Sequence, residues 1–197
     1  MTPLPDTLLE AVASAAVREG LADAVFTRLA SPLGRLLVVQ GPEGLVRIAF
    51  EEEPEDHVLA DVARVFGPRI VASNRELASE RDTLSAYLEG ATTVLDLPID
   101  LRLAASPFRR AVLEALHHDV ARGETITYGE LAAALADGST AYEVGQAVGR
   151  NPLSIVLPCH RVVGKNGALT GYAGGLSRKR FLLDLEAPVT AAAGRLF

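Results

Sequence analysis

The sequence has few residues of several kinds, and each shortage narrows what the chain can be. Among its 197 residues there is one cysteine, which excludes an internal disulfide and a cysteine-rich zinc site and makes a reducing cytoplasm the expected location. The longest stretch without a charged residue, 166–177, is far shorter than the roughly 20 apolar residues that a membrane-spanning helix needs. No basic segment followed by an apolar one opens the chain, so we expect no signal peptide. Lysine and arginine number 19 against 25 aspartate and glutamate, and the net charge of −6 taken alone argues against nucleic acid as a partner.

Hydrophobic residues make up 49% of the chain, enough for the core of one large domain or two small ones. Charge is distributed unevenly between the halves. Residues 1–96 carry eight arginines and sixteen acidic residues, a net −8, whereas residues 97–197 carry eleven basic and nine acidic residues, a net +2. Such asymmetry indicates two parts with different partners. We place the boundary after residue 98, which gives an N-terminal domain of residues 1–98 and a C-terminal domain of residues 99–197.

The N-terminal half is predicted to mix helices with a small antiparallel sheet. Apolar spacing predicts a helix over 8–18, and three short β-like runs follow at 24–29, 34–39 and 45–50. Turn-forming glycine and proline separate the runs, which favours a meander. The acidic run 51–56 is interpreted as a solvated loop, and a second helix is expected over 77–88.

The C-terminal half is predicted to be mainly helical, so the fold class is α+β. Ser106 followed by Pro107 predicts a capped helix that extends to about Val120. The segments 127–130 and 140–143 are both capping boxes, in which a threonine precedes a glutamate by three residues. Two short helices joined by a turn that contains glycine form a candidate helix-turn-helix, which alone is only a weak indication of DNA binding.

The one cysteine, Cys159, lies in an apolar run, where a thiol is usually an inert part of the core. Its neighbours favour reactivity. His160 and Arg161 follow it directly, and cationic or hydrogen-bonding neighbours lower a thiol pKa and favour the nucleophilic thiolate. A histidine that deprotonates a thiol needs a third group to orient its ring. Glu186, near the end of the helix predicted over 178–186, is the candidate.

These motifs resemble the O6-alkylguanine-DNA alkyltransferases, also called methylated-DNA–protein-cysteine methyltransferases. The segments that carry the resemblance occur in the family's order, and they are 107–112, 123–125, 128–132, Asn151-Pro152, Pro158-Cys159-His160-Arg161-Val162-Val163, 171–176, Lys179, 182–183 and Glu186. The resemblance covers about residues 106–186 and extends more weakly into the first half. The Pro-Cys-His-Arg-Val core with Asn-Pro at this spacing is much more specific than a lone Cys-His pair.

The resemblance implies DNA repair by a single-turnover transfer of an alkyl group from O6 of guanine, and less readily from O4 of thymine, to Cys159. It implies that His160 acts as a base through a bridging water, that Glu186 orients the imidazole, that Tyr128 donates a proton to the departing base and that Asn151 is a hinge. The expected substrate-binding residues are Tyr172, Val162, Val148 and Ser177. No cofactor and no metal are expected.

The resemblance also implies a monomer that binds alkylated DNA in the minor groove and flips the damaged base into a pocket. The expected DNA-binding residues are Thr140, Ala141, Tyr142, Gly145, Gln146 and Arg161. The family has an arginine where this chain has Tyr142, followed here by Glu143. A tyrosine can act as a wedge but lacks the positive charge, so we expect weaker engagement of duplex DNA that depends on salt.

Three other functions stay open at the level of sequence. A damage sensor would hold alkylated DNA without transferring anything, although relatives of that kind replace the cysteine. A cysteine hydrolase that uses Cys159, His160 and Glu186 would show turnover and no lasting modification. A transcriptional regulator built on the helix-turn-helix would normally need a dimerisation or sensor element, and we find none.

Overall fold

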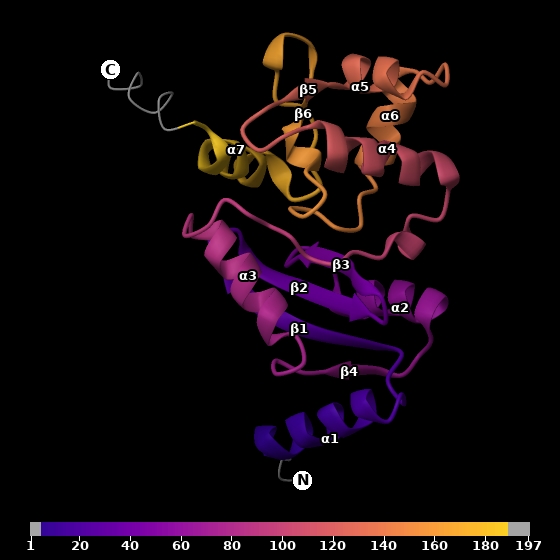
Figure 1. The fold of residues 1–197 in the computed structure, drawn as a ribbon, viewed down its shortest axis with the longest axis vertical. Helices are drawn as coiled ribbons and strands as arrows, with labels where there is room; N and C mark the ends of the chain where they lie inside the picture. Colours follow the sequence, from indigo (N-terminus) through magenta and orange to yellow (C-terminus); the bar gives the residue numbers. More distant parts are fainter. Residues whose placement is uncertain (1–4, 189–197) are drawn as a thin grey trace. The chain divides into compact units, whose positions relative to one another are not determined.

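The computed structural model describes residues 5–188, and the chain divides into two compact units, Met1–Leu103 and Ala104–Phe197 (Figure 1). The boundary predicted after residue 98 lies inside the first unit. There Ile99 forms a β-bridge with Leu45, and the backbone N–H of Asp100 donates to the Leu45 carbonyl over 2.8 Å. A single 3-10 turn, Leu101–Leu103, then ends the unit.

The first unit is built on a four-stranded sheet with the order β3-β2-β1-β4 (Figure 1). The predicted meander is confirmed, because β1 (Ala24–Ser31), β2 (Gly34–Gly41) and β3 (Gly44–Phe50) pair antiparallel in sequence. The sheet is mixed rather than purely antiparallel, since β4 (Ile70–Ala72) pairs parallel with β1. A strand of three residues is too short to show an alternating pattern, so the sequence gives no sign of it.

Three helices accompany this sheet, namely α1 (Asp6–Arg18), α2 (Glu55–Phe66) and α3 (Ala78–Leu88). The interpretation of 51–56 as a loop is wrong for its last two residues, because Glu55 and Asp56 form the first turn of α2. Carboxylates are favourable there, since they face the positive end of the helix dipole. The buried side chains Val58 and Val62 of α2 then pack into a core with residues of the sheet.

The second unit contains four helices among the described residues: α4 (Pro107–Asp119), α5 (Tyr128–Leu135), α6 (Ala141–Val148) and α7 (Gly175–Glu186). Two-residue strands β5 (Ile126–Thr127) and β6 (Val162–Val163) pair in parallel, and 3-10 turns form at Cys159–Arg161 and Lys165–Gly167. The predicted α+β fold is therefore confirmed. No helix within residues 5–188 is both long and apolar enough to cross a membrane.

The helix starts in this unit follow the signals in the sequence. Ser106 accepts a hydrogen bond from the Arg109 backbone over 3.1 Å at the start of α4. The capping boxes that begin with Thr127 and Thr140 are both complete, and they open α5 and α6 of the helix-turn-helix. Since α4, α5 and α6 share one apolar core that also contains Cys159, the helix-turn-helix is packed directly against the segment that carries the thiol.

Candidate active site

Asn151 fixes the loop that leads from α6 to Cys159. Its side-chain amide donates to the Leu157 carbonyl over 2.8 Å, and its side-chain oxygen accepts from the Leu153 backbone over 2.9 Å. All three residues are buried, so these two bonds satisfy backbone groups that water does not reach. Ile155, in the same loop, has a φ of 81°, a conformation rare for a β-branched residue. The loop is thus held in one shape by its own first residue.

Cys159 is 5% exposed and lies in the wall of a pocket of about 280 Å³. The other lining residues are Tyr128, Gly145, Val148, Gly149, Asn151, Gly171, Tyr172 and Ala173. Burial raises the pKa of the Cys159 thiol, while hydrogen bonds with Asn151 and Ser154 and the charge of Lys179 act in the opposite direction. The resting sulfur is therefore a thiol at neutral pH, and a base is needed to make it a nucleophile.

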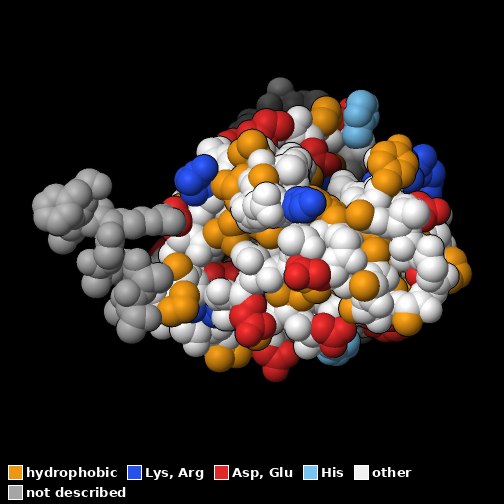
Figure 2. All heavy atoms as spheres, turned by 90° about the horizontal axis from the view of Figure 1, so that it is seen from above, with side chains coloured by type: hydrophobic (Ala, Val, Ile, Leu, Met, Phe, Trp, Pro, Cys, Tyr) orange, Lys and Arg blue, Asp and Glu red, His pale blue; other side chains and the backbone are white. Residues whose placement is uncertain are grey.

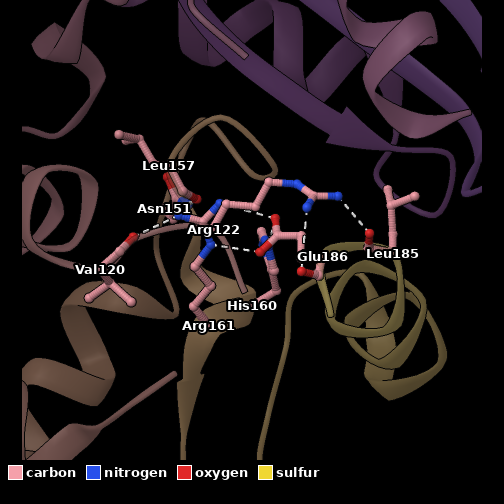
Figure 3. A network of polar contacts seen from close by, with 8 residues as sticks. All are labelled: Val120, Arg122, Asn151, Leu157, His160, Arg161, Leu185 and Glu186. Atoms are coloured by element: carbon pink, nitrogen blue, oxygen red, sulfur yellow. Dashed lines mark hydrogen bonds and ion pairs between the residues drawn. The ribbon is translucent and has the colours of Figure 1, made fainter. Parts of the chain in front are cut away.

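His160, which follows Cys159 directly, forms a buried pair with Glu186 (Figure 3). The imidazole Nε2 lies 2.8 Å from Oε1 of Glu186. A carboxylate only accepts hydrogen bonds, so the proton of the neutral ring is on Nε2 and the lone pair is on Nδ1. Burial lowers the pKa of His160, against the opposing effect of Glu186, which keeps the ring neutral at neutral pH. Nδ1 is buried and has no hydrogen-bond partner among the described residues, so it is the atom able to take up a proton.

Arg161 completes the surroundings of Glu186 (Figure 3). Its Nε donates to Oε2 over 2.8 Å, its Nη2 to Oε1 over 3.1 Å, and its Nη1 to the Val120 carbonyl over 2.7 Å. The guanidinium is mostly buried and engaged with its own protein. This geometry does not fit the DNA contact expected for Arg161, and it places the guanidinium against the buried carboxylate of Glu186 instead.

Arg122 and Gly123 hold the end of α7, a role that the sequence did not reveal. The Arg122 guanidinium donates to the carbonyls of Leu185 over 2.6 Å and Glu186 over 3.4 Å, which are left unpaired by the helix (Figure 3). Gly123 has a φ of +83°, and a Cβ there would lie 2.8 Å from the Glu186 carbonyl oxygen. The loop after α4 therefore fixes the backbone from which the Glu186 side chain extends.

Lys179 is fully buried, although a lysine on a helix near a DNA-binding motif is normally interpreted as a phosphate contact. Its Nζ donates to the Val162 carbonyl over 2.6 Å and to the Thr170 carbonyl over 2.9 Å. Burial lowers its pKa, and Cys159 acts in the opposite direction. The signal available in the sequence was spacing, because Lys179, Leu182 and Glu186 recur on one face of a helix.

The structure brings some of the expected substrate-binding residues to the pocket and not others. Tyr172 and Val148 line it, and burial raises the pKa of the Tyr172 hydroxyl well above its usual value. Val162 is fully buried in the core and Ser177 is exposed on α7, and neither belongs to the pocket lining. Substrate binding by Val162 and Ser177 therefore stays a prediction that the pocket lining does not support.

A second hollow, of about 660 Å³, adjoins the pocket and shares Tyr128, Gly145 and Gly171 with it. Its lining includes the expected DNA-binding residues Ala141, Tyr142 and Gln146 together with Lys165 and Thr170. Tyr142 is the most exposed large hydrophobic side chain on the described surface, at 75%. The hollow therefore leads from an exposed aromatic ring to the pocket whose wall contains the thiol.

Thr140 and Glu143 are committed to the start of α6. The threonine hydroxyl donates to Glu143 Oε2 over 2.8 Å, and the threonine backbone N–H donates to the same oxygen over 2.8 Å.

The lysine and arginine side chains on the face drawn in Figure 2 are scattered among uncharged and acidic ones and form no continuous basic surface there. Among residues 5–188 no group of three or more His, Cys, Asp or Glu is placed to hold a metal ion.

Two family models match the sequence: 6-O-methylguanine DNA methyltransferase, ribonuclease-like domain, over residues 24–101, and 6-O-methylguanine DNA methyltransferase, DNA binding domain, over residues 107–188. A methylated-DNA–protein-cysteine methyltransferase from Haemophilus influenzae is 38% identical over 82% of this chain and 85% of its own. Another from Mycolicibacterium paratuberculosis is 46% identical over 81% of this chain and 96% of its own.

The chain is also similar to solved structures of O6-methylguanine methyltransferases. The crystal structure of Mycobacterium tuberculosis OGT in complex with DNA is similar with a TM-score of 0.71 and 34% identity, over 85% of this chain and 97% of that one. An O6-methylguanine-DNA methyltransferase from Pyrococcus kodakaraensis is similar with a TM-score of 0.56 and 27% identity, over 84% and 99% of the two chains.

Proposed function

The chain belongs to the 6-O-methylguanine DNA methyltransferase family, and we propose that it repairs DNA by accepting the alkyl group of O6-alkylguanine on Cys159. The observation that carries the assignment of the acceptor is the placement of this thiol. Cys159 lies in a pocket wall, and the residue after it is a neutral histidine oriented by a buried carboxylate. These are the parts that activation of a thiol requires.

The transfer is a displacement at the alkyl carbon. Nδ1 of His160 takes the Cys159 proton through a bridging water, and the sulfur then attacks the carbon as the bond from that carbon to O6 breaks. Tyr128, which lines the pocket, donates its hydroxyl proton to the departing guanine, and the proton held by His160 returns to the phenolate through solvent. In sum, a bond from sulfur to carbon replaces one from oxygen to carbon, and one proton passes from the thiol to guanine.

The product explains why each molecule acts once. A thioether has no carbonyl for water to attack, so His160 has no second half-reaction to perform. The chemistry needs no cofactor or metal, and it needs a reduced thiol, which supports the cytoplasm as its location. Transfer of the alkyl group from O4 of an alkylated thymine to Cys159 follows the same displacement with a less suitable leaving group.

Access to the pocket requires the damaged nucleotide to leave the duplex. Unstacking and unpairing costs a few kcal/mol and least for a mispaired, alkylated base. We propose that α6 lies in the minor groove, that Tyr142 acts as an aromatic wedge in the vacated space and that one monomer suffices. Exposure of this ring at the entrance of the hollow that leads to Cys159 supports the role.

Mass spectrometry of the alkylated protein tests this function against the alternative of a damage sensor. The chain is incubated with a duplex that contains O6-methylguanine, and the peptide that carries Cys159 is examined for one added methyl group. We expect full conversion at one lesion per protein and none in the matched variant Cys159→Ser. Binding without any methylated peptide from correctly folded protein would identify a sensor instead.

A further inference from the structure

We propose that Arg109 and Arg150 form a second DNA contact, a site for a backbone phosphate on the flank of α6 that neighbours the hollow at Tyr142. The inference rests on the proposed function, since it assumes that α6 lies in a groove of DNA. The two arginines would supply the positive charge toward DNA that is missing from α6 because Tyr142 stands where the family has an arginine.

The two arginines line a pocket of about 430 Å³ that is separate from the one at Cys159. Three segments enclose this arginine pocket, namely the start of α4, the turn at 137–139 and one side of α6. The lining residues are Ser106, Phe108, Arg109, Asp137, Gly138, Ser139, Glu143, Gln146, Ala147 and Arg150. An apolar floor with converging polar groups is typical of a ligand site.

Neither guanidinium is used by the protein itself. Among the described residues, the side chains of Arg109 and Arg150 make no hydrogen bond and no ion pair, in contrast to those of Arg122 and Arg161. Burial and the nearby charge of Arg150 both lower the pKa of Arg109. Two like charges held together without a partner cost free energy in the unbound protein, and an anion placed between them removes that cost.

Two carboxylates also line the pocket, but both face helix or turn N–H groups. Asp137 accepts from the Ser139 backbone over 2.9 Å, and Glu143 accepts from Thr140 as part of the capping box. These bonds lower the pKa of both carboxyls, so both are charged while directed to their own backbone. The carboxylates therefore partly offset the field of the pocket, while the donors of the guanidinium groups remain available to a ligand.

The arginine pocket and the hollow at Tyr142 lie on neighbouring flanks of α6 and meet at Gln146. Ala141, Tyr142 and Gly145 line the hollow shared with Tyr128, whereas Ala147 and, just after the end of α6, Arg150 line the arginine pocket. Gln146 lies between them and lines both. A helix that lies in a groove has one sugar-phosphate backbone on each side. The arginine side thus meets the DNA strand opposite the strand whose damaged base enters the Cys159 pocket. A guanidinium group can bind a phosphate there by two parallel hydrogen bonds.

The salt dependence of duplex binding tests the site directly. Fluorescence anisotropy is measured with a duplex that contains O6-methylguanine, over a series of KCl concentrations, for Arg109→Ala, Arg150→Ala and the double variant. The slope of log K against log salt falls by about 0.9 for each lost phosphate contact, so we expect a smaller slope for each single variant and the smallest for the double. Arg180→Ala is the matched control, because Arg180 is an exposed arginine of the same unit outside the arginine pocket.

Two further measurements separate the outcomes. The double lysine variant, Arg109→Lys with Arg150→Lys, retains both charges, so we expect it to retain most of the slope even where an alanine variant folds poorly. Transfer from the free base O6-benzylguanine to Cys159 needs no DNA contact, and we expect it to be unchanged in all these variants. Slopes equal to that of Arg180→Ala would overturn the phosphate site while transfer from the free base continues. If the unaltered protein transfers no alkyl group from either the free base or DNA, the proposed function is overturned. The salt slopes of the variants would still decide whether the arginines contact phosphate.

Discussion

Nε2 of His160 and Oε1 of Glu186 are 2.8 Å apart at a place where neither side chain is exposed to solvent. The pair fixes which imidazole nitrogen carries the proton, so the carboxylate decides whether Nδ1 can act as a base. We expect Glu186→Gln to slow methyl transfer by about a hundredfold or more, because an amide can present its NH₂ to the ring and select the wrong tautomer. Single-turnover rates with the lesion duplex measure the loss.

The same substitution removes the charge that Arg161 pairs with, and breaking a buried ion pair typically costs about 3 kcal/mol or more of stability. Urea denaturation of Glu186→Gln checks this cost. Asp184→Asn is the control, since Asp184 is an exposed carboxylate of the same helix. Equal methyl-transfer rates for Glu186→Gln and Asp184→Asn would contradict the role of Glu186.

The pKa of His160 predicts a loss of stability in mild acid. Burial lowers the pKa of this group below its ordinary value of 6.5, so the unfolded chain binds a proton that the folded one refuses. The stabilising contribution is complete above pH 6.5 and is lost as the pH falls toward the folded pKa, by at most about 1.4 kcal/mol per pH unit. Denaturation at a series of pH values is the measurement, and we expect His160→Gln to show the flatter dependence. An unchanged slope in that variant, compared with exposed His118→Gln, would show that another group titrates.

Restoring an arginine at the tip of α6 is expected to favour duplex DNA. Tyr142→Arg adds a positive charge at the 75%-exposed position, and we expect transfer from duplex to rise by about tenfold, or about 1.4 kcal/mol, with a smaller gain on single strands. Transfer rates on both substrates are compared, with Tyr142→Phe as the control that keeps the ring. An equal gain on both substrates would refute the wedge role.

Removing the arginine that caps α7 is expected to loosen its last turn. In Arg122→Ala the carbonyls of Leu185 and Glu186 lose a charged donor, which typically costs about 2 kcal/mol. We expect faster hydrogen exchange of the amides at 183–186, and slower methyl transfer as Glu186 loses its fixed position. Arg122→Lys keeps a donor and recovers part of both effects. Unchanged exchange in Arg122→Ala would mean that α7 needs no such cap.

Local signals in the sequence predicted most of the second unit. Helix starts at Ser106, Thr127 and Thr140 were predictable because a cap and its partner are only three residues apart. The candidate pairing of His160 with Glu186 came from the need of a thiol-activating histidine for an orienting group, and its geometry came only with the fold. The three-residue strand β4 and its parallel pairing lay beyond a local pattern.

The charged residues near the site show why the rest could not be predicted. Arg161 was expected to contact DNA, and Lys179 and Arg122 come under the rule that a basic residue is usually exposed. Each instead donates to carbonyls or a carboxylate more than eight residues away along the chain. Such contacts depend on which helix ends the fold brings together, and no spacing within the sequence records that.

Gly123 does not line the pocket at Cys159 and precedes the cysteine in the sequence by the whole helix-turn-helix, yet the Glu186 carbonyl leaves no room for a side chain on its Cα. Any other residue there must displace the backbone on which the carboxylate depends. A genetic screen for alleles that fail to protect cells from alkylating agents should therefore return substitutions of this loop glycine together with those of Cys159 and His160. Substitutions of Gly123 would appear in such a screen because its backbone packs closely against that of Glu186, and not because Gly123 takes part in the reaction.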